Sequence, residues 1–195
     1  MNTFSWIFLL ALGVSLAIKL WLARRQLQNV AANRARVPDA FADSIQLEAH
    51  QKAADYTITN TLQGRLELVY NSLLLVGWTL GGGLQWLDSS WQQFGWGTIS
   101  TGVAMLVSAF MIMALLELPF SLYHTFVIEE RFGFNKTTPA TFIGDMAKQA
   151  LLMLILGVPL AWAALWLMQE SGHLWWLYLW LLWAGFSLLM LWAYP

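Results

Sequence analysis

The stretch LWWLYLWLLWAGFSLLMLWAY, residues 174–194, contains no charged side chain. A helix needs about 20 predominantly apolar residues to cross the hydrocarbon core of a bilayer. Four further stretches have the same character: residues 4–22, 68–87, 99–122 and 146–168. The second is the most polar, because Asn71, Ser72, Gln85 and three glycines at 81–83 interrupt it. The sequence therefore predicts an all-α integral membrane protein with five transmembrane helices.

The composition of the whole chain supports this class. Of its 195 residues, 58% are hydrophobic and 11% are charged, whereas a soluble domain typically carries about 25% charged residues. This balance argues against an ordinary soluble domain, a disordered chain and a nucleic-acid-binding module. The chain has no cysteine, which excludes a disulfide scaffold, a thiolate zinc site and a cysteine nucleophile.

The basic residues predict the orientation of the spans. Cytoplasmic loops of membrane proteins carry an excess of Lys and Arg. All ten basic residues lie at or between the ends of spans one and two or spans three and four, whereas residues 88–98 and 169–173 contain none. We therefore expect the N-terminus outside and the C-terminus in the cytoplasm. No positive charge precedes the first span, which favours a retained anchor over a cleaved signal peptide.

Two cytoplasmic segments are expected, at residues 23–67 and 123–145. In the first, we expect a helical arm, with the Val37-Pro38 step interrupting the helix, Asp39 capping a new one and Gly64 marking a bend. In the second, the β-prone residues 125–128 predict a short strand or hairpin. Pro119 is expected to kink or end the third span, and Pro159 with Gly157 to kink the fourth.

The two segments contain the blocks HQKAADYT, residues 50–57, and VIEERFGFNKTT, residues 127–138. Both resemble blocks of the CAAX prenyl protease 1 family, which are integral-membrane zinc metallopeptidases. The RRQ stretch at residues 24–26 and the Val37-Pro38 step are similar as well. The resemblance follows the chain in order and implies the family's N-terminal five-helix membrane region, one domain over residues 1–195.

The zinc site of that family has no counterpart in this sequence. The family carries a His-Glu-x-x-His helix, in which two histidines bind zinc and the glutamate activates water. The three histidines here, His50, His124 and His173, are not spaced four apart and none is followed by Glu. We expect the chain alone to bind no zinc and to be inactive without a zinc-bearing catalytic half, since it ends at Tyr194-Pro195 where the family continues.

The resemblance implies that polar residues of the two blocks position substrate or contact the catalytic half. From the residues alone, an ordinary helix-surface histidine is the favoured interpretation of His50. A structural contact with a nearby base is favoured for Asp55, and solvated charge is favoured for the acidic pair at 129–130. The candidates are His50, Gln51, Asp55, Tyr56, Glu129, Glu130, Arg131, Asn135 and Lys136.

The sequence thus predicts the membrane-embedded N-terminal region of a zinc metalloendopeptidase, forming chamber wall and substrate-positioning surface. The alternatives are a non-catalytic membrane scaffold or regulator derived from the family and, less favoured, a small transporter, because no inverted repeat is evident. Expected partners are the lipid bilayer, a catalytic half and a peptide or protein substrate, with no nucleic acid. A multi-pass location follows, in the inner membrane if the protein is bacterial.

Overall fold

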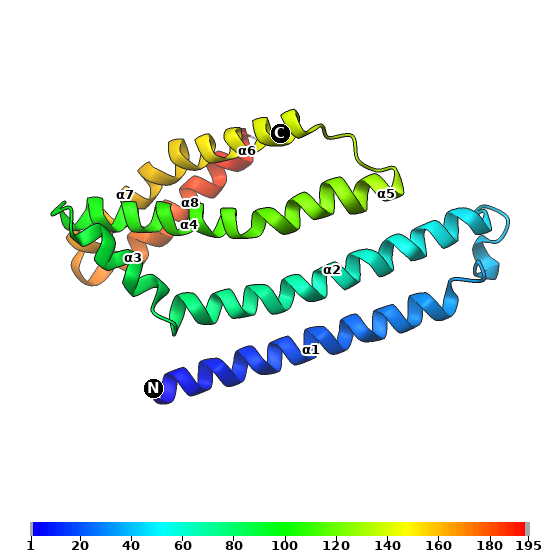
Figure 1. Ribbon diagram of the computed structural model, residues 1–195. Helices are drawn as coiled ribbons and strands as arrows, with labels where there is room; N and C mark the ends of the chain where they lie inside the picture. Colours follow the sequence, from blue (N-terminus) through cyan, green and yellow to red (C-terminus); the bar gives the residue numbers. More distant parts are fainter. Residues whose placement is uncertain (1, 194–195) are drawn as a thin grey trace. The chain divides into compact units, whose positions relative to one another are not determined.

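The structure, a computed structural model, describes residues 2–193, and within this range its regular elements are all helices (Figure 1). This confirms the all-α prediction. The elements are α1 (Thr3–Asn33), a 3-10 turn (Asp39–Phe41), α2 (Leu47–Thr79), α3 (Gly83–Gln92), α4 (Thr98–Tyr123), a π-helical turn (His124–Glu129), α5 (Glu130–Phe132), α6 (Pro139–Leu152), a second π-helical turn (Met153–Gly157), α7 (Val158–Glu170), a 3-10 turn (Gly172–Leu174) and α8 (Trp175–Ala193).

The chain forms two compact units. The first comprises the chain up to Gly83 together with Glu117–Thr137, and the second comprises Leu84–Leu116 and the chain from Thr138 onward. Both sequence blocks that resemble the protease family fall almost entirely within the first unit.

The first unit is built on α1 and α2, which pack side by side and run antiparallel (Figure 1). The Asn2 side chain caps α1 by accepting a hydrogen bond from the Ser5 main-chain N–H at 2.9 Å. At 1.5 Å per residue, the 31 residues of α1 extend about 46 Å. This length exceeds the ~30 Å hydrocarbon core, so α1 continues well past its apolar stretch, and residues 23–33 are helical as predicted.

The connection between α1 and α2 differs from the prediction in two ways. The helix breaks before Pro38, as expected, but Asp39 caps no long helix: it begins a three-residue 3-10 turn, and α2 starts at Leu47. The Asp39 carboxylate instead accepts a hydrogen bond from Arg36 at 2.6 Å. A bend was expected at Gly64, and α2 continues through this residue to Thr79 without interruption. Main-chain hydrogen bonding within a long helix outweighs the small helix-destabilising effect of one glycine.

The predicted strand at residues 125–128 is wrong. These residues continue the helix from α4 as a π-helical turn, His124–Glu129, and α5 follows without a break. The β-propensity of Val127 and Ile128 is a weak preference that tertiary packing overrides, and Ile128 is only 1% exposed. Pro119 lies inside α4, which continues to Tyr123, so it does not end this helix.

The second unit contains two helical stretches that meet in a hairpin. Thr138 and Thr141 form a reciprocal cap that starts α6, and the π-helical turn at Met153–Gly157 joins α6 to α7 immediately before Pro159. The sequence predicted a kink at this point, and π turns are among the structures that bend helices. A short turn then leads into α8, which packs against α7; the last residue of the predicted fifth span, Tyr194, lies outside the described residues.

Within residues 2–193, four helical stretches are long and apolar enough to cross a membrane: Thr3–Asn33, Thr98–Phe132, Pro139–Glu170 and Gly172–Ala193. The predicted second span, residues 68–87, is divided between the end of α2 and the start of α3. The glycines cause this interruption. Gly82 has a positive φ of 82°, and a Cβ on Gly81 would lie 2.7 Å from the Gly77 carbonyl oxygen.

Candidate functional site

The two blocks of the first unit meet at Tyr56 and Glu129. Tyr56 lies on α2 and Glu129 ends the π-helical turn, and the phenol hydroxyl donates a hydrogen bond to the Glu129 carboxylate. The two residues are 73 positions apart in the chain. This contact therefore joins the segment that follows α4 to the part of α2 that the sequence predicts to be cytoplasmic.

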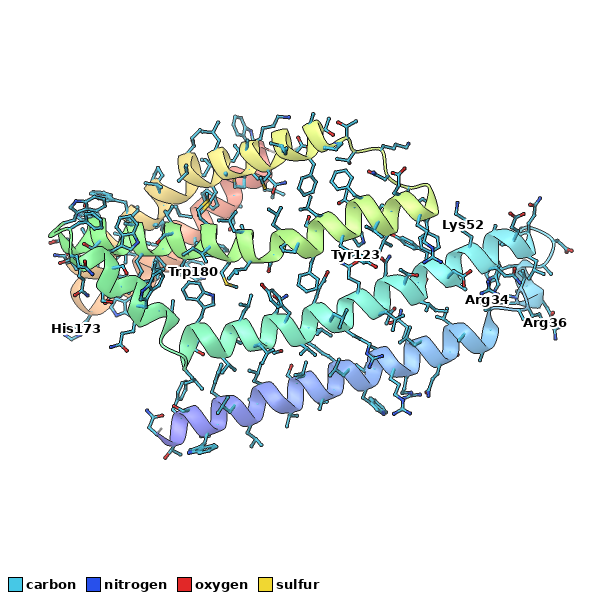
Figure 2. The ribbon with its side chains drawn as sticks, in the orientation of Figure 1. Arg34, Arg36, Lys52, Tyr123, His173 and Trp180 are labelled. Carbon is cyan, nitrogen blue, oxygen red and sulfur yellow. The ribbon has the colours of Figure 1, made fainter. Side chains whose placement is uncertain are left out.

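Aromatic rings surround the Tyr56 contact. The Tyr56 ring packs edge-on against Phe132 at 5.2 Å and against Phe134 at 5.0 Å between centroids. Phe132 is 6% exposed, and the Lys52 ammonium lies 5.4 Å from the centre of the Phe134 ring (Figure 2). Edge-to-face pairs and cation–π contacts both stabilise such a cluster. Aromatic contacts, as well as the Tyr56–Glu129 hydrogen bond, therefore hold residues 129–134 against α2.

The segment around Glu129 is organised by its own hydrogen bonds. The main-chain oxygen of Glu129 accepts from the N–H groups of Phe134 and Asn135 at 2.9 and 3.1 Å. Asn135 also donates to the Glu130 carboxylate at 2.9 Å and accepts from the Thr137 N–H at 2.7 Å. Gly133 makes this turn possible with a positive φ of 74°. These bonds hold the Glu130 and Asn135 side chains to each other and to the turn.

Glu129 has a second polar neighbour. His124 Nε2 lies 3.7 Å from Glu129 Oε1, and the Glu129 side chain is 20% exposed. The hydrogen bond to the Glu129 carboxylate raises the pKa of Tyr56 above its ordinary value, while a hydrogen bond with Asn60 acts in the opposite direction. Tyr56 therefore stays a neutral donor, and Glu129 is occupied as its acceptor.

Asp55, beside Tyr56 on α2, pairs with the end of α1. Arg34 Nε and Nη2 donate to the two Asp55 carboxylate oxygens at 2.7 and 2.8 Å (Figure 2). These hydrogen bonds lower the pKa of Asp55 and raise that of Arg34. His50 reinforces the same junction, because its Nε2 donates to the Asn33 carbonyl oxygen at 2.9 Å. Both residues thus connect α1 to α2, which is the structural contact favoured for Asp55.

The remaining candidates differ in their surroundings. Arg131 is exposed and its guanidinium lies 5.7 Å from the centre of the Phe132 ring. Glu130 and Lys136 are exposed, and Gln51 is half-buried on α2. Consecutive positions in a helical turn point about 100° apart, and Glu129 and Glu130 have different partners, Tyr56 and Asn135. The two carboxylates are therefore not arranged as a pair for acid–base chemistry.

Besides Asn60 and His124, sequence reasoning missed three residues of this site. Arg34 was counted only as a cytoplasmic charge, and Phe132 and Phe134 were only part of a matched block. The signal for the aromatic pair was Phe-Gly-Phe at 132–134, since a glycine between two rings allows a turn that brings both to one side. No local signal identifies Arg34, because its partner Asp55 lies 21 residues away.

The histidines and carboxylates do not form a metal centre. Among residues 2–193, no three His, Asp or Glu side chains are grouped closely enough to hold an ion. His50 contacts the Asn33 carbonyl oxygen, His124 lies near Glu129, and His173 lies in the second unit. The described residues do not fit a zinc site.

The helical architecture and apolar spans define a multi-pass integral membrane protein. The sequence model for the CAAX prenyl protease N-terminal region, which has five membrane helices, matches residues 26–195. This chain belongs to that family and corresponds to its N-terminal membrane region.

Relatives of known name agree. A CAAX prenyl protease 1 homolog of Caenorhabditis elegans is 30% identical over 163 residues, covering 84% of this chain and 36% of the relative. The human homolog is 28% identical over 198 residues, covering 96% of this chain and 42% of the relative. The crystal structure of S. mikatae Ste24p has a TM-score of 0.86 at 21% identity, covers 97% of this chain and 45% of that one, and shows the same fold. This chain spans less than half the length of each.

Proposed function

We propose that this chain, residues 1–195 as one domain, forms the membrane-embedded wall and substrate-positioning surface of a zinc metalloendopeptidase. Zinc and the water-activating group would come from a catalytic half outside this chain. The observation that supports the proposal is the meeting of the two family blocks at Tyr56 and Glu129.

The residues divide into two groups in this proposal. Asp55, Tyr56 and Glu129 are positioning residues, because each is held by a partner within the first unit. Gln51, Glu130, Arg131, Asn135 and Lys136 would offer hydrogen-bonding groups to the catalytic half or to an extended peptide. His50 belongs to the first group through its bond to Asn33. The substrate would be a peptide or protein; the relatives are named as CAAX prenyl proteases.

The proposed topology has five crossings, with the N-terminus outside and the C-terminus in the cytoplasm. The end of α2 and the start of α3 together would supply the second crossing, in addition to the four apolar stretches. The family's five membrane helices support this number. In a bacterium the protein would lie in the inner membrane.

The test is cleavage by the reconstituted enzyme. The chain is co-expressed with a zinc-bearing catalytic half of the family, and hydrolysis of a reporter peptide is measured. Tyr56→Phe and Glu129→Leu each remove one partner of the hydrogen bond and should lower kcat/KM about ten-fold or more, because displacing a positioning segment by about an ångström has effects of that order or larger. Thermal midpoints of the assembled complex show whether each variant still folds.

Glu170→Gln, at the end of α7 in the second unit, is the matched control and should cleave like the wild type. Wild-type rates in both site variants would overturn the positioning role. Assembly without any zinc-dependent hydrolysis would instead favour the scaffold or regulator alternative.

A further inference from the structure

A cavity of about 490 Å³ lies between α1 and α2 in the first unit. Neither the Tyr56–Glu129 contact nor the Arg34–Asp55 pair occupies it. It combines small, hydroxyl, amide and basic side chains, contributed by Ala23, Gln26, Tyr56, Thr57, Asn60, Thr61, Gly64, Arg65 and Leu68.

Arg65 is the positively charged side chain that lines this cavity. No carboxylate of the described residues lies within ion-pairing distance of it, whereas Arg34, on the same helix pair, holds Asp55 with a two-point fork. A guanidinium presents five N–H donors suited to phosphate or carboxylate oxygens. The cavity therefore has an anion-binding group that the protein itself leaves without a counter-charge.

The rest of the wall supplies acceptors. Asn60 Oδ1 is buried and has no hydrogen-bond partner among the described residues. The hydroxyls of Thr57 and Thr61 donate to main-chain oxygens at 2.8 and 2.7 Å, so their remaining lone pairs can only accept. A ligand that satisfies this wall carries an anion for Arg65 and at least one O–H or N–H donor.

The cavity lies where two apolar stretches begin or end. Ala23 follows the apolar residues 4–22 of α1, and Leu68 begins the apolar part of α2. Lys19, Arg24 and Arg25 flank the same point on α1. Lipid headgroups occupy this level, and basic pockets between helices at the cytoplasmic face bind anionic headgroups.

We propose that this cavity binds the headgroup of an anionic phospholipid that carries free hydroxyls, such as phosphatidylglycerol. Its phosphate would bind the Arg65 guanidinium, a headgroup hydroxyl would donate to Asn60 Oδ1, and an acyl chain would continue along Leu68. Tyr56 lines the cavity as well as contacting Glu129, but the proposed headgroup contacts are made by Arg65, Asn60 and Leu68, which have no role in the proposed proteolysis.

The test measures lipid retention by the purified full chain. Native mass spectrometry from detergent compares phosphatidylglycerol with phosphatidylcholine of the same acyl chains. Arg65→Gln should weaken phosphatidylglycerol retention about five-fold, which is the effect expected for one basic residue at a membrane surface. Arg36→Gln removes the same charge from an exposed ion pair with Asp39 and should leave retention unchanged.

A second variant blocks the cavity and keeps Arg65. Nothing lies within 4 Å of a Cβ built on Gly64, so Gly64→Leu fits the helix and fills the space that the headgroup would occupy. It should abolish the preference for phosphatidylglycerol and raise the thermal midpoint of the lipid-free chain, because leucine favours a helix over glycine. Gly144→Leu, on α6 with equally open space, should keep the preference.

Each result decides the proposal. Loss of retention in Arg65→Gln and Gly64→Leu, with both controls unaffected, supports it. Equal losses in Arg36→Gln and Arg65→Gln would show bulk electrostatic attraction and overturn it, as would an unchanged preference in Gly64→Leu. Competition by inorganic phosphate or glycerol 3-phosphate at concentrations equal to the lipid would assign the site to a soluble phosphate rather than to a lipid.

Discussion

At the scale of single residues, the Arg34–Asp55 pair predicts an acid response of the α1–α2 junction. Arg34 lowers the pKa of Asp55 below its ordinary 3.8. A carboxyl whose pKa is depressed by folding stabilises the folded state above its unfolded pKa, and this contribution disappears as the pH falls through the folded pKa. We therefore expect the junction to loosen below about pH 4, measured as lower hydrogen-exchange protection at residues 30–37 after correction for the pH dependence of the intrinsic exchange rate.

Asp55→Asn should remove this pH response and show fast exchange already at neutral pH. Asp39→Asn is the control: Asp39 pairs with Arg36 only three positions away and does not join the two helices. Protection at residues 30–37 that is independent of pH in the wild-type chain would contradict the role of the pair.

The same scale shows the limit of sequence reasoning for the site. Tyr56 and Glu129 were identified because each belongs to a long matched block, but the hydrogen bond between them follows from how two helices pack. Arg34 could not be assigned, since ion pairing over 21 positions depends on where α1 ends and where the chain turns back. The sequence shows the type of each residue directly, whereas its hydrogen-bond or ion-pair partner depends on how the chain folds.

At the scale of elements, Gly133 controls the turn after α5. Its φ of 74° lies in the left-handed region, where a side chain costs roughly 1–2 kcal/mol. Gly133→Ala should destabilise the chain by about that amount and release Phe134 from the Tyr56 ring. Gly144→Ala, inside α6, should instead stabilise by about 0.5–1 kcal/mol. Thermal unfolding in detergent measures both; equal midpoints for the two variants would refute the requirement at Gly133.

Elements were predicted with uneven success for a physical reason. The apolar stretches of α1, α4 and α8 were recognised because a run of about 20 apolar residues matches the thickness of the hydrocarbon core. The helix at 124–129 was mistaken for a strand because a π turn retains helical hydrogen bonding in residues whose own preference is for β-structure. The interruption at residues 80–82 requires a positive φ at Gly82. A run of glycines permits this conformation but does not by itself predict it.

At the scale of the whole molecule, the number of crossings is open to direct measurement. The chain contains no cysteine, so single cysteines report their side of the membrane without background. Ser44→Cys, before α2, and Ser89→Cys, on α3, should label from opposite faces if the second crossing exists. A membrane-impermeant maleimide on sealed right-side-out vesicles should label Ser89→Cys and should label Ser44→Cys only after permeabilisation.

Labelling of both positions from the same face would show that α2 does not cross, leaving the four apolar stretches as the spans. Ser171→Cys, between α7 and α8, serves as the outer reference in the predicted topology. The family and its membrane region could be identified from sequence because long blocks match in order. Sidedness could not be established, since charge asymmetry expresses only a statistical preference of the insertion machinery.

The hydrogen bond between Tyr56 and Glu129 also bears on how this family can change. A phenylalanine at position 56 would leave the carboxylate at position 129 without its donor, and a residue that cannot accept at 129 would leave the phenol unsatisfied. Replacing both residues together is therefore less destabilising than replacing one of them alone. Across homologous sequences, the two positions should therefore covary, although 73 residues separate them.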